Sequence, residues 1–338
     1  MTTVTDQQSN ERMPEALAPR RLRRRAAVVI GALAVVVLIP VLAPGLSDVR
    51  DKLGDASPGW LVVAVVLEGL SCVSYVLMFR PVFCDSMRWR SSFELGLAEL
   101  AVGSIVPASG AGGLAVGAWV LRRDGMPAER IARRSVAFFL IKSSVNFVAV
   151  AVIGLLMAIG VGPHRSLLLT ALPAAAAVLV IVLILLISRL GPGENPGDGA
   201  GRLRRWASAA RRSLIQGTGE AVVLVRSGDV PLIAGSIGYW AFDNAVLIAT
   251  FAAFGVALPL TILLMGYLIG QLGGLLPLPG GVGGIDGGLI GVLVLYGAPA
   301  AVTVAAVLAY RLILFWLPLI AGTPAFISLW RRVHPAEA

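Results

Sequence analysis

The sequence predicts an all-α polytopic membrane protein with about six full transmembrane helices and two oppositely oriented re-entrant hairpins. Of its 338 residues, 57% are hydrophobic and only 14% are charged, a composition far from that of soluble globular domains. Its apolar residues gather in runs of about 20, the length that crosses a bilayer. Its basic residues lie between those runs. These observations together exclude a soluble protein.

The net charge of +9 does not indicate a nucleic-acid-binding protein, because the basic residues alternate with apolar segments instead of forming one patch. The cysteines, Cys72 and Cys84, would lie ~18 Å apart along a helix, too far for a disulfide. The histidines, His164 and His334, fall in predicted loops. We therefore expect no metal site, no cofactor and no enzymatic activity.

The first predicted helix is Ala26–Leu46, preceded by a basic cytoplasmic tail, residues 1–25, that we expect to be disordered. The arginines at 20–25 resemble the start of a secretory signal. The apolar run, however, is longer than the ~7 to 15 residues of a signal core, and no small-residue cleavage site follows it. We predict a retained transmembrane helix.

Five further runs have spanning length, and the basic residues orient them. Arginines concentrate in the N-terminal tail, in segments 80–92, 122–134 and 189–229, and at the end of the last run. By the positive-inside rule these segments and both termini are cytoplasmic. The single membrane domain then covers residues 26–332, with a short tail at 333–338. The five runs are Trp60–Phe79, Val136–Val161, Leu167–Ser188, Leu232–Val256 and Val302–Leu329.

Two apolar regions, Phe93–Leu121 and Leu260–Tyr296, are interrupted by Pro and Gly. The first lies between two predicted cytoplasmic loops and must cross an even number of times, yet it is too short for two helices of ~20 residues. A re-entrant hairpin satisfies both constraints. The same parity predicts a hairpin from the opposite face for the second region. Full spans with Gly or Pro kinks are the alternative interpretation.

The turns of the two hairpins resemble each other, which indicates an inverted repeat with a site near the membrane midplane. Exposed amides at such a turn attract phosphate or carboxylate. Close helix packing by small residues would explain the glycines equally. The first turn contains Pro107, Ser109, Gly110, Gly112 and Gly113, and the second contains Pro277, Pro279, Gly280, Gly281, Gly283 and Gly284.

Ionisable residues deep in apolar segments are candidate site residues, because each charge there costs roughly 2.5 to 3.5 kcal/mol. Arg311 is too deep to reach either interface and needs a headgroup or an internal partner, either Asp243 or Asp286. Lys142 could extend towards the cytoplasm, but Asn146 shares its helix face and favours an orientation towards the bundle. Structural ion pairs are the alternative role. The six residues are Glu68, Glu99, Lys142, Asp243, Asp286 and Arg311.

The segment from Leu276 to Asp286, then Leu295–Pro299 and Tyr310-Arg311, resembles the lysylphosphatidylglycerol synthase transmembrane-region family, the flippase-like membrane part of multiple peptide resistance factors. Asp286 stands where that family often has Glu, and Gly112-Gly113 replaces its frequent Gly-Glu. Two-part members carry a cytoplasmic aminoacyl-transferase domain after this region. This chain ends at Ala338, so we expect a stand-alone member that does not aminoacylate lipids.

The resemblance implies movement of a lipid or lipid-linked headgroup between leaflets of a bacterial inner or plasma membrane. Three other roles stay open: an ion-coupled small-solute transporter, a membrane-embedded lipid-modifying enzyme and a non-transporting scaffold for envelope biogenesis. Expected partners are membrane phospholipids, including anionic lipids at the basic segment 189–229, whose arginines alternatively serve topology alone. A homo-oligomer or envelope-biosynthesis partners are further expectations, and nucleic acid is not. The predicted binding residues are Pro107, Ser109, Gly110, Gly112, Gly113, Lys142, Asn146, Asp243, Asn244, Pro279, Gly280, Gly281, Gly283, Gly284, Asp286 and Arg311.

Overall fold

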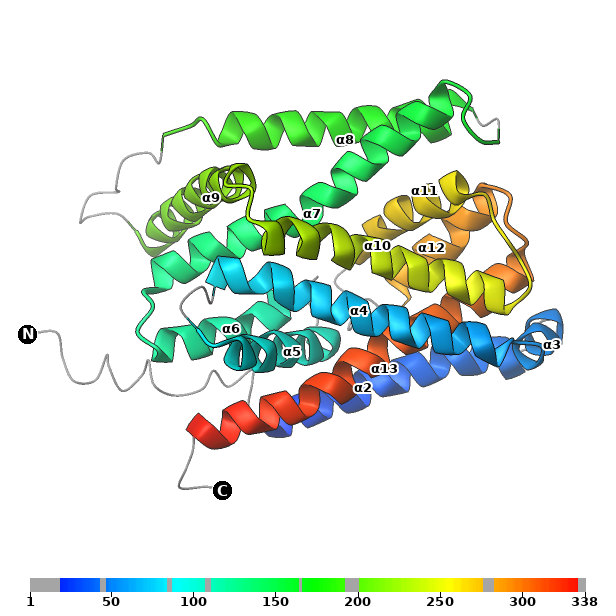
Figure 1. Ribbon diagram of the computed structural model, residues 1–338, viewed down its shortest axis with the longest axis horizontal. Coiled ribbons are helices and arrows are strands. Elements are labelled where there is room, and N and C mark those ends of the chain that lie inside the picture. Colours follow the sequence, from blue (N-terminus) through cyan, green and yellow to red (C-terminus); the bar gives the residue numbers. More distant parts are fainter. Residues whose placement is uncertain are drawn as a thin grey trace, which may run out of the picture.

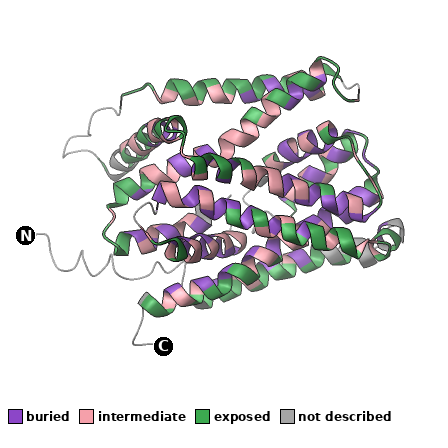
Figure 2. Cartoon of the chain, viewed as in Figure 1, coloured by how far each residue is buried: buried purple, intermediate pink, exposed green. Residues whose placement is uncertain are grey.

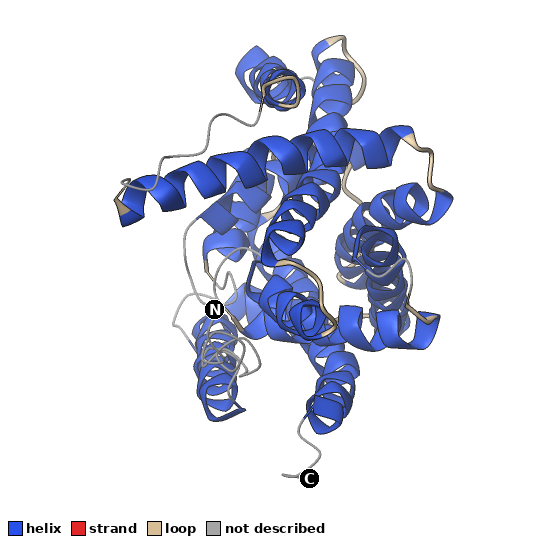
Figure 3. Cartoon of the chain, turned by 90° about the vertical axis from the view of Figure 1, so that its left-hand side faces the viewer, coloured by secondary structure: helices blue, strands red, loops and turns tan. Residues whose placement is uncertain are grey.

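A computed structural model describes residues 19–42, 47–83, 87–106, 111–163, 166–191, 201–275 and 283–333, and its regular elements there are all helices (Figure 3). Five helices are long and apolar enough to cross a membrane. The predicted all-α, polytopic class is therefore confirmed. The five are α4 (Pro58–Phe83), α7 (Ala128–Ala158), α8 (Leu167–Ile187), α10 (Val230–Ala253) and α13 (Ala300–Val333).

Each of these five helices overlaps one of the predicted full spans, with boundaries that mostly differ by a few residues. The largest extension is at α7, which begins eight residues before the predicted span because its first two turns are basic and leave the apolar run. The predicted first span falls in α2 (Pro19–Leu42), and residues 43–46 lie outside the described chain. One helix, α3 (Ser47–Gly54), was not predicted, because it is short and polar.

The two interrupted regions form pairs of shorter helices. The first consists of α5 (Trp89–Ile105) and α6 (Ala111–Arg123), and the second of α11 (Leu260–Gly270), the 3-10 helix η2 (Gln271–Leu275) and α12 (Gly284–Leu295). The α5–α6 pair lies in the half of the molecule where α2 begins and α13 ends, whereas α11 and α12 lie in the other half (Figure 1). The two pairs therefore occupy opposite ends of the long axis.

Glycines allow the central helices to approach closely. A Cβ at Gly235 of α10 would lie 2.4 Å from the Met78 amide nitrogen of α4, and one at Gly322 of α13 would lie 2.1 Å from the Leu97 carbonyl oxygen of α5. Small residues drive helix association in bilayers because they bring backbones into van der Waals contact. These contacts hold α10 against α4 and α13 against α5, and so position the polar residues that face between them.

The two largest apolar clusters among the described residues make up most of the core. One packs Leu247, Met265 and Leu293 from α10, α11 and α12, and the other packs Phe79, Leu95 and Phe138 from α4, α5 and α7. The outer helices instead expose apolar side chains, as the green ribbon of α8 shows (Figure 2). On α8, Leu168 is 72% exposed and Leu179 is 58% exposed. Large exposed aliphatic surface is expected where lipid tails are the solvent.

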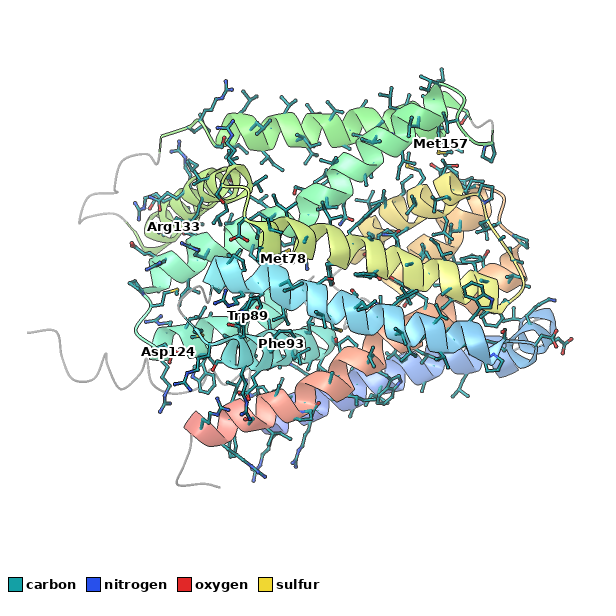
Figure 4. All side chains as sticks on the ribbon, viewed as in Figure 1. Met78, Trp89, Phe93, Asp124, Arg133 and Met157 are labelled. Atoms are coloured by element: carbon teal, nitrogen blue, oxygen red, sulfur yellow. The ribbon has the colours of Figure 1, made fainter. Side chains whose placement is uncertain are left out.

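The predicted basic segment 189–229 contains α9 (Arg202–Arg226), which lies against α7 at the end of the molecule where α2 begins (Figure 1). Glu220 of α9 forms ion pairs with Arg133 (2.7 Å) and Arg134 (2.5 Å) of α7. The Arg134 guanidinium also donates to the Val82 carbonyl oxygen of α4 at 2.6 Å. Arg133 marks this junction among the side chains (Figure 4). Helix α9 is thereby attached to the first half of the bundle.

Candidate functional site

Buried ionisable side chains from six helices form the candidate site. The four carboxylates are almost inaccessible, with exposed fractions of 5% for Glu68, 1% for Glu99, 7% for Asp243 and 3% for Asp286. Lys142 from α7 and Arg311 from α13 are the two deep cations. A buried charge is tolerated only when paired or neutralised, so the partners of each group determine what the site can do.

These groups interact in an alternating series that we call the polar row. Glu99 interacts electrostatically with Lys142, Lys142 with Asp243, and Asp243 with Arg311. Arg311 in turn pairs with Asp286. Negative and positive groups therefore alternate from α5 in the first short-helix pair to α12 in the second. Glu68 of α4 lies beside the centre of the row, where it interacts with Asp243.

At the α12 end of the row, both carboxylate oxygens of Asp286 have a polar partner. The Arg311 Nε lies 3.1 Å from its Oδ1, and the Gly283 backbone N–H donates to its Oδ2 at 3.0 Å. Gly283 adopts φ +84°, a left-handed conformation that favours glycine. Asp286 also lies in the first turn of α12, where the helix dipole stabilises a negative charge. Of the two partners that the sequence left open for Arg311, the ion pair is with Asp286.

At the centre of the row, Asp243 accepts hydrogen bonds from two tyrosines. The Tyr310 hydroxyl donates to its Oδ1 at 2.7 Å, and the Tyr267 hydroxyl donates to its Oδ2. The neighbouring Asn244 uses its side-chain amide to donate to the Trp240 carbonyl oxygen of its own helix at 2.8 Å, while its Oδ1 is buried without a hydrogen-bond partner. Asp243 is therefore fixed by α11 and α13 together.

Sequence reasoning did not include the two tyrosines among the site residues. A tyrosine in an apolar run is equally compatible with simple packing, and Tyr267 carries no other signal. Tyr310 directly precedes the charged Arg311, and a helix places adjacent residues about 100° apart, so the two can serve different partners. That adjacency was the available signal.

At the α5 end of the row, Glu99 has a different environment. Both oxygens of its carboxylate are buried and accept no hydrogen bond from the described residues. It packs against the glycine face of α6: a Cβ at Gly113 would lie 2.5 Å from the Glu99 backbone oxygen, and one at Gly117 would lie 3.4 Å from its Oε1. The Tyr75 hydroxyl and the Lys142 ammonium group are the polar groups that act on it.

Lys142 is directed into the bundle. Its Nζ lies 5.8 Å from the centroid of the Tyr239 ring on α10, within cation–π range. Asn146, one turn later on α7, has a buried Oδ1 without a hydrogen-bond partner. This placement agrees with the orientation that Asn146 suggested in the sequence. Glu68 completes the polar residues of this region, and its Oε1 accepts a weak bond from the Cys72 thiol at 3.7 Å.

The predicted Gly-rich turns are only partly described. Pro107, Ser109 and Gly110 of the first turn, and Pro279, Gly280 and Gly281 of the second, lie outside the described residues. Gly112 and Gly113 begin α6, and Gly283 and Gly284 begin α12. A Cβ at Gly273 of η2 would lie 2.1 Å from the Gly284 carbonyl oxygen. Gly284 therefore takes part in close packing, the alternative role considered for these glycines.

Across the parts of the chain that the structure describes, no group of three or more His, Cys, Asp or Glu side chains could hold a metal ion. The carboxylates of the polar row are instead separated by cations and tyrosines. Such an arrangement can exchange charged partners: an anion can compete for Lys142 or Arg311, and a cation or a proton can compete for the carboxylates. It is suited to binding a charged group at membrane depth.

Comparisons with known proteins agree with this description. A family model described as the lysylphosphatidylglycerol synthase TM region matches residues 26–322, a range that includes every member of the polar row. A UPF0104 membrane protein of Methanothermobacter thermautotrophicus is 24% identical over 321 residues, which cover 88% of this chain and 93% of that protein.

Proposed function

The chain belongs to the lysylphosphatidylglycerol synthase transmembrane-region family, and on this premise we propose that it moves a lipid or a lipid-linked headgroup between the leaflets of a membrane. In this proposal the α5–α6 and α11–η2–α12 segments are re-entrant hairpins of an inverted repeat. Their positions at opposite ends of the long axis support that assignment (Figure 1). The membrane would be a bacterial inner or plasma membrane, with both termini on the cytoplasmic side.

The observation that carries the proposal is the polar row. Four carboxylates and two cations are expensive to keep at membrane depth, and the Asp286–Arg311 pair shows how one of each is neutralised by an ion contact within the row. The phosphate of a headgroup could take the place of a carboxylate beside Lys142 or Arg311, and its amine could take the place of a cation beside a carboxylate. No charge would then be left unpaired. Arg311 and Lys142 would hold the phosphate, and Asp243 and Asp286 would hold a cationic group or a proton.

The outer surface suits a lipid substrate. Between α7 and α8 lies an open groove of about 520 Å³ lined by aliphatic side chains, among them Ala151, Leu155, Ala174 and Leu179. Acyl chains can remain in such apolar surroundings while only the headgroup passes through the polar core, because hydrocarbon gains nothing by entering a polar site. The basic helix α9 would contact anionic lipids at the cytoplasmic surface. A homo-oligomer or envelope-biosynthesis partners are compatible with this role, which requires no catalysis.

The test is leaflet exchange of fluorescent phospholipids with anionic, zwitterionic or cationic headgroups in proteoliposomes. The wild type should accelerate exchange of at least one class, and Asp286→Asn and Arg311→Ala should abolish it. Glu129→Gln, an exposed carboxylate in the first turn of α7, is the matched control and should exchange lipid like the wild type. Absence of wild-type exchange for every headgroup, with and without a proton gradient, would contradict the proposal.

A second candidate role, a non-transporting scaffold, is favoured by one observation. Asp286 is paired with Arg311 and hydrogen-bonded to Gly283, as in a purely structural ion pair. A scaffold should tolerate replacement of both residues by apolar ones of similar size, such as Asp286→Leu with Arg311→Met. A lipid transporter should fold with this double substitution and lose exchange.

A further inference from the structure

The four buried carboxylates differ in how their negative charge is stabilised. Asp286 has an ion pair and a backbone N–H, Asp243 has two tyrosine hydroxyls, and Glu68 has the Cys72 thiol. Glu99 is the most buried of the four, and among the described residues it has neither a backbone N–H nor a short hydrogen bond, although the Tyr75 hydroxyl faces it. An unsolvated carboxylate without donors is strongly disfavoured unless a cation neutralises it. Glu99 is therefore the carboxylate whose charge depends most on a single neighbour.

That neighbour is Lys142. From α4, the Tyr75 hydroxyl faces Glu99, and from α6 the contact surface is glycine. Arg332 of α13 pairs with Glu94 of α5 at 2.9 Å, and not with Glu99.

Helix α2 contributes the apolar Leu22 to the cluster that contains Leu95 of α5. On α10, Tyr239 and Asp243 act on Lys142. Lys142 is thus the charged group through which Glu99 is linked to the rest of the row.

We propose that the buried Glu99 and the partly buried Lys142 form a proton-linked anion site, in which Lys142 binds a phosphate monoanion only when Glu99 carries a proton. In the empty state, the Glu99 carboxylate and the Lys142 ammonium neutralise each other. When the phosphate binds, it becomes the counterion of Lys142. Glu99 then accepts one proton from solution. Proton and phosphate enter together and leave together, so the net charge of the site does not change. The inference specifies ligand and coupling for the proposed lipid movement, and in that sense rests on it.

A proton fits this site better than a metal ion does. Alkali and alkaline-earth cations require several oxygen ligands in a shell, and here the ammonium group of Lys142 would repel them. A proton needs only the carboxylate itself. One helical turn after Lys142, the Asn146 Oδ1 is a further buried acceptor without a hydrogen-bond partner. The glycine face of Gly113 and Gly117 lets α6 pack directly against Glu99, so no side chain of that face competes with the proton for the carboxylate.

The site is tested by calorimetric titration of the full-length protein in detergent, in two buffers of different ionisation enthalpy. The probes are a short-chain phosphatidylglycerol, glycerol phosphate and inorganic phosphate, which distinguish a lipid headgroup from free phosphate. With the wild type we expect about one proton taken up per short-chain phosphatidylglycerol bound, because this phosphodiester stays a monoanion. Its dissociation constant should weaken about tenfold per pH unit once Glu99 is deprotonated. Glycerol phosphate and inorganic phosphate are compared below about pH 6, where they too are mainly monoanions.

Two substitutions separate the partners. Glu99→Gln imitates the protonated state, so it should bind the short-chain phosphatidylglycerol with no proton uptake and no pH dependence. Lys142→Gln should lose phosphate binding. Glu129→Gln should keep both the binding and the proton uptake of the wild type.

The outcomes also separate this inference from the proposed function. Wild-type phosphate binding without proton uptake, or no binding of any probe at any pH, overturns the inference even if no variant folds. Lipid exchange together with proton-independent binding would leave the proposed function intact and remove the coupling. Proton-linked binding without lipid exchange would support the anion site and contradict movement between leaflets.

Discussion

Each of the two short-helix segments contains a buried carboxylate, Glu99 in the helix before the first Gly-rich turn and Asp286 in the helix after the second, and the two carboxylates differ in their contacts. Asp286 of α12 is fixed by Arg311 and by the Gly283 N–H, whereas Glu99 of α5 has neither contact. The glycines differ accordingly. Gly283 supplies a hydrogen bond, but Gly113 and Gly117 only make room. We infer that in the empty state the Asp286 end of the polar row is held more firmly, and that the Glu99 end responds first to bound charge.

The largest expected effect comes from breaking the fixed end. Arg311→Ala leaves Asp286 buried without its cation, and removing one partner of a buried pair typically costs ~3–5 kcal/mol. We expect a marked loss of thermal stability in detergent, measured by intrinsic fluorescence or aggregation. The double substitution Asp286→Leu with Arg311→Met should recover most of the loss. A single variant as stable as the wild type would show that this end is not fixed by the ion pair.

The glycine faces provide the second test. A Cβ at Gly113 would lie 2.5 Å from the Glu99 backbone oxygen, and backbone cannot move aside cheaply. Gly113→Ala should therefore destabilise the protein by ~1–3 kcal/mol. Gly287→Ala on α12 is the control, because nothing lies within 4 Å of its Cβ position. The control should be neutral or slightly stabilising. Equal losses of stability for the two substitutions would contradict the close packing of α5 against α6 at Gly113.

The centre of the row should show an intermediate effect. Tyr310→Phe deletes the hydroxyl that donates to Asp243 at 2.7 Å, and a hydrogen bond to a charged group contributes about 1.5–3 kcal/mol. Tyr267→Phe removes the second donor. The double variant should lose less unfolding free energy than the sum of the two single variants if Asp243 takes up a proton once both donors are gone. Strict additivity of the unfolding free energies would indicate that Asp243 stays ionised.

Much of the fold follows from the sequence, because the bilayer imposes simple rules. Span length and loop arginines predicted five helices, and most of their boundaries agree with the structure to within a few residues. The five are α4, α7, α8, α10 and α13. The rules do not recognise the short α3, whose composition is polar. These rules also do not predict how each helix is rotated about its own axis. The sequence therefore does not decide whether Arg311 pairs with Asp243 or with Asp286, because the choice depends on the relative rotation of α12 and α13.

The candidate site was predictable in its charges and not in its contacts. All six deep ionisable residues were recognised from the cost of burial alone. The alternation that links them was not, since it depends on side chains from six helices meeting in the core. The donors Tyr267 and Tyr310 were missed because aromatic residues in apolar runs usually pack. The missing hydrogen bonds of Glu99 have no sequence signal, because they depend on which neighbours α6 presents.

The smallest expected effect on stability comes from Glu99→Gln, and its comparison with Asp286→Asn tests directly how the α5 and α12 ends of the polar row differ. Glu99→Gln is nearly isosteric and leaves Lys142 with Asp243 as a second negative neighbour, so the loss of unfolding free energy should be smaller than the ~3–5 kcal/mol typical of a broken buried pair. Asp286→Asn should cost several times more, because it weakens the contact with Arg311 and the acceptor for Gly283. Both variants are measured by thermal unfolding in the same detergent at neutral pH. A reversed order would make Glu99 the structural carboxylate and Asp286 the responsive one, and the roles of the two ends of the row would have to be exchanged.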